Sequence, residues 1–115
     1  TWFIYEGLLE FEILKANLEQ MPEIPFKIML NVGNPERAFA FHSLPHFGVG
    51  LARLEFIISQ LIGIHPKALL EFSKLPRDLK EEIQLQTAAY ENPVEFYIER
   101  LKEGVATIAA AFAPH

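Results

Sequence analysis

Residues 27–53 constrain the fold most, because they hold two strand-like runs on either side of a helix start. Residues 27–32 form a compact apolar run, and residues 49–53 form a second run of small and β-branched side chains. Between them, Asn34 suits a helix cap, and residues 35–42 begin with proline and read as a short helix. A strand, a helix and a strand in this order predict a βαβ unit with parallel pairing and a right-handed crossover.

The chain after Arg53 has helical patterns almost to its end. Residues 54–62 are apolar at helical spacing and are followed by Gly63, and residues 66–72 and 77–89 predict two further helices. Asn92 then precedes a proline and starts a long helix. The side chains expected on its apolar face are Val94, Tyr97, Ile98, Leu101, Val105, Ile108, Ala109 and Phe112.

The first twenty residues predict a separate β segment. Apolar residues alternate loosely over residues 2–5 and 9–14, and Gly7 between them suggests a turn joining two short strands. Residues 21–25 contain two prolines and mark the expected boundary with the main fold. Two parallel strands do not complete a sheet, which is normally covered on both faces. The helical half therefore predicts a large crossover leading to a third strand that this chain lacks.

Composition excludes several classes of function. Ten lysines and arginines against fifteen acidic residues give a net charge of −5 without a basic stripe, which argues against a nucleic-acid surface. The chain of 115 residues has no cysteine, so disulfides, thiolate metal sites and a thiol nucleophile are excluded within it. The charge-free run at residues 38–52 is too short to span a bilayer, and no basic leader precedes an apolar core. We therefore expect a soluble, cytoplasmic globular segment that amounts to one domain or to a piece of a larger one. Its ends, at Thr1 and just past a helical run at His115, suggest a segment excised from a longer protein.

Arg53 is the main candidate for a ligand-binding residue. It ends the second strand run, and in barrels of alternating strands and helices ligands bind at that end. A guanidinium there can bind a phosphate or carboxylate with two parallel hydrogen bonds, or it can pair with Glu55 in a purely structural role. Asn31, near the end of the first run, can contact a ligand or satisfy loop amides. Glu55 either orients Arg53 or simply begins the next helix.

Other motifs do not predict a catalytic or metal site. His42 and His46 have the spacing of metal ligands on a helix, but a proline lies between them, and neither His65 nor His115 completes such a set. Gly48 and Gly50 precede a strand and lack the third glycine of a dinucleotide fingerprint, and there is no Walker-type lysine motif. We therefore expect no nucleotide or metal site in this segment.

Three stretches in order, residues 27–39, 48–57 and 62–72, resemble phosphoenolpyruvate synthase (pyruvate, water dikinase), and the similarity extends over nearly the whole chain. Two sister groups, pyruvate, phosphate dikinase and the phosphoenolpyruvate-dependent sugar-transport phosphotransferase, favour threonine after the arginine. This chain has Leu54 there and Ala52 before the arginine, which favours the synthase group.

The resemblance implies an α/β fold: an incomplete (β/α)8 TIM-barrel segment with two parallel strands and a large helical crossover, preceded by the short β segment. Residues 21–115 would begin the barrel that binds phosphoenolpyruvate or pyruvate, and residues 1–20 would be the tail of a phosphohistidine domain and its linker. The family makes phosphoenolpyruvate from pyruvate, ATP and water, releasing AMP and phosphate, and Arg53 matches its substrate-binding arginine.

The resemblance also implies which parts lie outside this segment. These are a second substrate arginine, acidic Mg²⁺ ligands, a proton-donating cysteine, the phosphohistidine and the ATP-binding domain. His46 and Phe47 depart from the Asn-Asp or Asn-Glu that the family usually has before Gly48. We expect the isolated segment to be inactive and to self-associate through its open sheet edge and apolar faces. A sister phosphoenolpyruvate-utilising enzyme and a non-catalytic scaffold or regulatory domain remain the alternatives.

Overall fold

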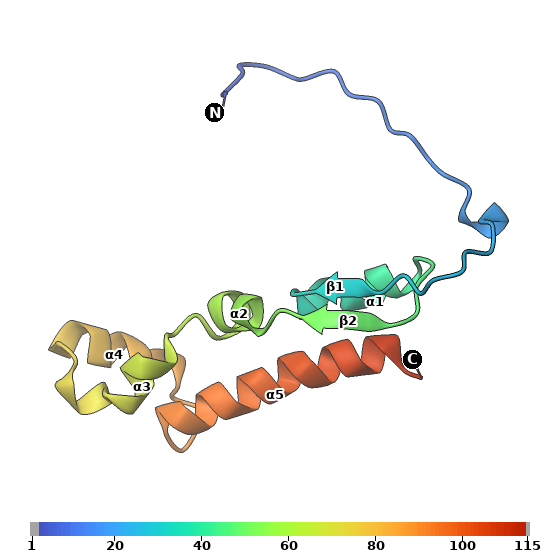
Figure 1. The fold of residues 1–115 in the computed structure, drawn as a ribbon. Coiled ribbons are helices and arrows are strands. Elements are labelled where there is room, and N and C mark those ends of the chain that lie inside the picture. Colours follow the sequence, from blue (N-terminus) through green and yellow to red (C-terminus); the bar gives the residue numbers. More distant parts are fainter. Residues whose placement is uncertain (1–2, 115) are drawn as a thin grey trace.

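The computed structural model describes residues 3–114 and contains two strands and five α-helices (Figure 1). In chain order these are β1 (Leu30–Val32), α1 (Ala38–His42), β2 (Val49–Ala52), α2 (Leu54–Ile57), α3 (Pro66–Leu70), α4 (Arg77–Gln86) and α5 (Pro93–Phe112). Short 3₁₀ turns occupy Leu18–Gln20, Pro35–Arg37 and Phe72–Lys74, and a π-helical turn, Ile58–Ile62, continues α2.

The predicted βαβ unit is confirmed. Strands β1 and β2 pair in parallel, with Leu30 opposite Val49 and Val32 opposite Ala52, and the register is irregular after Leu30. Before α1, the side chain of Asn34 accepts a hydrogen bond from the backbone N–H of Glu36 at 2.9 Å. That bond satisfies one of the amide groups left free at a helix start, which explains why the chain turns into a helix here.

The other predicted helix boundaries also follow from local groups. The side chain of Asn92 accepts a hydrogen bond from the N–H of Glu95 at 2.9 Å, with Pro93 at the first position of α5. Gly63 adopts a left-handed conformation with φ of 73°, and its N–H donates to the carbonyl of Ile58 at 2.8 Å. Glycine takes this conformation at little cost, and so it ends the helical stretch that α2 begins.

Helix α5 connects two clusters of buried side chains. The sheet cluster joins β1, α1, α2 and the second half of α5, through Val32, Ala38, Ile57, Ile108, Ala111 and Phe112. The helical cluster joins the π-helical turn, α3, α4 and the first half of α5, through Ile62, Ile64, Leu69, Ile83 and Phe96. Figure 1 shows α5 running along the body of the molecule, antiparallel to β2. The long helix therefore holds the sheet and the helical region together.

The predicted apolar face of α5 is partly wrong. Ile98 and Val105 are 50% and 44% exposed, whereas Gly104 is buried. A Cβ atom at Gly104 would lie 2.8 Å from Cγ2 of Ile57, so the helix packs tightly against Ile57 at this glycine. A residue with no side chain thus belongs to the buried side of α5, and counting apolar residues alone does not reveal this.

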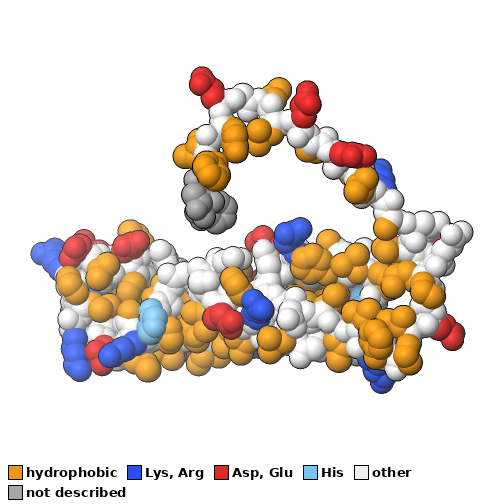
Figure 2. All heavy atoms as spheres, turned by 45° about the horizontal axis from the view of Figure 1, so that its top comes forward, with side chains coloured by type: hydrophobic (Ala, Val, Ile, Leu, Met, Phe, Trp, Pro, Cys, Tyr) orange, Lys and Arg blue, Asp and Glu red, His pale blue; other side chains and the backbone are white. Residues whose placement is uncertain are grey.

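The predicted β segment before residue 21 is also wrong over its described part. Residues 3–17 contain no strand; they form an extended, exposed arm that leaves the body of the molecule (Figures 1 and 2). Gly7 makes a bend with φ of 97°, but no second strand lies beside the arm. Alternating apolar residues suit a strand only where a partner can accept its hydrogen bonds. Thr1 and Trp2 of this prediction, like His115, lie outside the described residues.

No helix within residues 3–114 has the length and apolar character needed to cross a membrane.

Candidate functional site

Arg53 lies where both strands end. It is the N-cap residue of α2, directly after β2, and its backbone N–H donates to the carbonyl of Val32, the last residue of β1, at 2.8 Å. This hydrogen bond continues the parallel pairing by one residue and ties the loop after β2 to the end of β1. The exposed side chain of Arg53 thus starts from a backbone position that two strands hold.

The guanidinium of Arg53 has an aromatic neighbour and no paired carboxylate in the described region. Its Cζ atom lies 5.9 Å from the ring centroid of Phe56, at the outer limit of a cation–π contact. The ion pairs found within residues 3–114 lie in the region from Glu71 to Glu103 and do not include Arg53 or Glu55. The positive charge at the strand ends therefore faces solvent without internal neutralisation.

The other two candidate residues lie near Arg53 in the fold. Asn31 is the exposed middle residue of β1 and pairs with Leu51, which is 51% exposed on β2. Because Val32 is buried among the helices and side chains alternate along a strand, Asn31 belongs to the opposite, open face of the sheet. Glu55 is an exposed residue in the first turn of α2. In the described region neither side chain forms a hydrogen bond.

Phe56 is a neighbour of the site that the sequence patterns did not single out. Its ring is packed against the loop that follows β1: a Cβ atom at Gly33 would lie 2.8 Å from Cδ2 of Phe56. Phe56 thus contacts the loop after β1 while belonging to the helix after β2. Its place in an apolar run was visible in the sequence, but its contact with a residue 23 positions earlier depends on the pairing of the strands.

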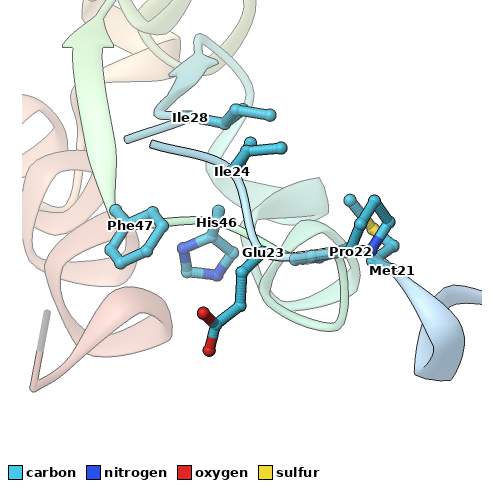
Figure 3. Close-up of a pocket in the computed structure, with 8 residues that line it drawn as sticks. Met21, Pro22, Glu23, Ile24, Ile28, His46 and Phe47 are labelled. Carbon is cyan, nitrogen blue, oxygen red and sulfur yellow. The ribbon is translucent and has the colours of Figure 1, made fainter. Parts of the chain in front are cut away.

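A hollow of about 450 Å³ lies at the opposite end of the strands (Figure 3). Its walls are the linker before β1 and the loop before β2: Met21, Pro22, Glu23, Ile24, Ile28, Pro45, His46 and Phe47. His46 is already used in this loop, because its Nδ1 accepts a hydrogen bond from the N–H of Gly48 at 2.9 Å. That bond leaves Nε2–H to donate to the carbonyl of His42 at 3.2 Å. The hollow is mostly apolar and is not the place where Arg53 lies.

His65 and His42 also have structural contacts. Nδ1 of His65 accepts a hydrogen bond from the N–H of Lys67 at 3.1 Å and caps α3. The ring of His42 lies 5.6 Å from that of His46 and 6.2 Å from that of Phe112. Within the part of the chain that the structure describes, no three His, Asp or Glu side chains are placed to hold a metal ion together. The guanidinium of Arg53 at the strand ends is a group whose chemistry suits a phosphate or carboxylate.

Curated relatives match nearly the whole chain, although no family model matches it. Phosphoenolpyruvate synthase of Pseudomonas aeruginosa (strain UCBPP-PA14) is 59% identical over 114 residues, which are 99% of this chain and 14% of that protein. The enzymes of the same name from Deinococcus radiodurans and Escherichia coli (strain K12) are 54% and 53% identical, again over 99% of this chain and 15% and 14% of their own lengths. These matches confirm the resemblance found in residues 27–39, 48–57 and 62–72.

Proposed function

We propose that this chain, which is homologous to a segment of the phosphoenolpyruvate synthases, begins their substrate barrel and that Arg53 binds phosphoenolpyruvate or pyruvate in it. The chain spans only 14–15% of the length of the first relatives that it matches, so the activity would belong to a longer protein. That protein would convert pyruvate, ATP and water into phosphoenolpyruvate, AMP and phosphate through a phosphohistidine, in the cytoplasm. In this proposal residues 1–20 are the tail of the phosphohistidine domain, and residues 21–115 begin the barrel.

The position of Arg53 is the observation that carries the proposal. The residue follows β2 directly, is hydrogen-bonded to the end of β1, and presents an exposed guanidinium that no described carboxylate neutralises. In (β/α)8 barrels, substrates bind at this end of the strands. Phosphoenolpyruvate carries a phosphate and a carboxylate, and both match the geometry of a guanidinium.

The direction of α5 supports the barrel part of the proposal. Its last residue, Phe112, has its ring centroid 5.0 Å from that of His46, which lies just before β2. The end of α5 is therefore beside the beginning of β2 (Figure 1), where a third parallel strand would have to start. A helix that returns the chain to the start of the strands is the repeating step of a (β/α)8 barrel.

The proposed role of Arg53 is electrostatic. Phosphoryl transfer depends mainly on positioning and on stabilising charge around the transferred group, and a fixed guanidinium can do both. Magnesium would complement this charge in the longer protein. Its ligands would come from other segments, as the resemblance to the synthases implies. One arginine cannot replace those groups, so we propose that the isolated segment is inactive.

Substitution of Arg53 in the full-length protein tests the proposal. We expect Arg53→Met to weaken the binding of phosphoenolpyruvate, measured by titration calorimetry, about 10- to 100-fold, because hydrogen bonds to a charged partner are lost. The affinity of Arg53→Lys for phosphoenolpyruvate should lie between those of Arg53→Met and the parent, because lysine keeps the charge but not the planar guanidinium.

Lys27→Met is the matched control. Lys27 lies before β1, at the opposite end of the sheet, with Nζ 6.0 Å from the ring centroid of Phe47, and its loss removes the same charge. We expect the control to bind phosphoenolpyruvate as the parent does. Unchanged affinity in Arg53→Met would refute the proposed role of Arg53.

A further inference from the structure

We infer that Phe56 is a positioning residue for Arg53, and that Gly33 is needed for Phe56 to occupy its place. The inference rests on the proposed function, in which Arg53 binds the anionic substrate. It adds two residues to that site: Gly33 from the loop after β1, and Phe56 from α2, the helix after β2. Neither residue needs to touch the substrate for this role.

Phe56 and Arg53 belong to the same first turn of α2. The backbone N–H of Phe56 donates to the carbonyl of Arg53 at 3.1 Å. This bond fixes the spacing of the two residues, and the ring then lies with its centroid 5.9 Å from Cζ of Arg53. Phe56 as a residue is 39% exposed, so it is packed in part and still open in part toward the guanidinium.

Gly33 determines where the ring can lie. A Cβ atom at this position would be 2.8 Å from Cδ2 of Phe56, closer than packed carbon atoms come, and 3.2 Å from its Cβ and Cγ atoms, which is tighter than most packed contacts. Gly33 does not have a positive φ, so close approach and not an unusual backbone conformation requires glycine here. The loop after β1 therefore forms one wall of the place that Phe56 occupies.

The consequence for Arg53 is a smaller set of side-chain conformations. Arginine has a long, flexible side chain, and no described carboxylate holds this one. A ring that attracts the flat guanidinium restricts its position, while the N–H groups at the edge of the guanidinium stay free for a phosphate or carboxylate. Less ordering is then required when the anion binds.

A double-mutant cycle in the full-length protein, with phosphoenolpyruvate as the probe, tests this role. We expect Phe56→Leu to weaken binding about two- to fivefold, as the loss of a cation–π contact predicts, and Phe56→Tyr to retain near-parent affinity because it keeps the ring. In an Arg53→Met background, Phe56→Leu should have no further effect. Phe47→Leu, which removes the ring beside Lys27 at the other end of the sheet, is the matched control and should bind normally.

Each outcome decides a separate point. The positioning role is wrong if Phe56→Leu weakens binding equally in the parent and in the Arg53→Met background. It is also wrong if Phe56→Leu has no effect on binding although Arg53→Met weakens it. In both cases the proposed function stands. If Arg53→Met binds like the parent, the proposed function fails and the positioning role fails with it. Thermal unfolding of every variant checks that it is folded. If Phe56→Leu does not fold, Gly33→Ala provides the same test, because its Cβ displaces the ring.

Discussion

At the scale of single residues, glycines decide how closely the elements of this molecule approach one another. Gly33 admits the ring of Phe56, and Gly104 admits Ile57 together with Leu61, whose Cδ2 atom would lie 3.2 Å from a Cβ at position 104. Both contacts join residues that are far apart in the sequence. A side chain at either position would separate elements that are now packed directly together.

We expect Gly104→Ala to destabilise the folded protein, although alanine favours helices. Overpacking a tight contact costs about 1–3 kcal/mol, whereas the gain in helix propensity is about 1 kcal/mol. Urea unfolding of the full-length protein measures this change in the free energy of unfolding. The transition to analyse is the one in which α5 unfolds. Ala106→Gly, at an exposed position of the same helix, gives the propensity effect alone. A neutral or stabilising Gly104→Ala would show that α5 and α2 are further apart than described.

At the scale of elements, α5 matters most because the two core clusters meet along it. Twenty residues give it a length of about 30 Å. Its first half packs Phe96 in the helical cluster, its second half packs Ile108 in the sheet cluster, and Leu101 contacts both. Helix α5 is therefore the element that both clusters share. Strands β1 and β2 form only a short two-stranded sheet.

We expect Asn92→Ala to cost about 1 kcal/mol of stability, because the hydrogen bond to the N–H of Glu95 is lost at the start of α5. Asn92→Asp is the control: it keeps an acceptor oxygen and adds a negative charge where the helix dipole favours one. Thermal unfolding of both variants compares the two effects. Equal losses in both variants would mean that Asn92 contributes something other than the cap.

At the scale of the whole molecule, the chain is more open than a complete domain of its length. Its radius of gyration is 19.8 Å, against about 13 Å for a compact domain of 115 residues. The exposed arm accounts for part of this difference (Figure 1), and Figure 2 shows hydrophobic side chains on both the arm and the body of the molecule. Among the exposed hydrophobic residues, Leu51 lies on β2 and Met29 lies directly before β1. Such exposed apolar area usually indicates an interface.

We expect the isolated 115-residue chain to self-associate at micromolar concentrations, because its sheet has free edges and an open face. Sedimentation velocity over a range of concentrations measures this. Leu51→Lys places a charge on the open face and should reduce association. A monomer at every concentration would contradict the prediction. Phosphoenolpyruvate formation by the same sample would contradict the proposal that the segment alone is inactive.

Much of the local structure could be predicted because it depends on groups close in the sequence. Asn34 and Asn92 cap helices through amides two and three residues away, and Gly63 ends a helical stretch through its own backbone. The parallel pairing of the strands could also be predicted from the sequence. Two strand-like runs joined by one short helix can be connected in only a few ways. The position of Arg53 was predicted in the same way, as the charge that ends the second run, and the residue follows β2 directly.

The sequence by itself therefore determined where most helices begin and end, the βαβ unit, and the position of Arg53 at the strand ends. Only the tertiary structure decided that the arm of residues 3–17 is unpaired, that α5 turns Gly104 inward, and that Phe56 lies close to both Gly33 and Arg53. The physical reason is the range of the interactions. A cap or a turn is satisfied within a few residues, but a strand needs a partner, and a buried helix face needs a surface that distant residues supply.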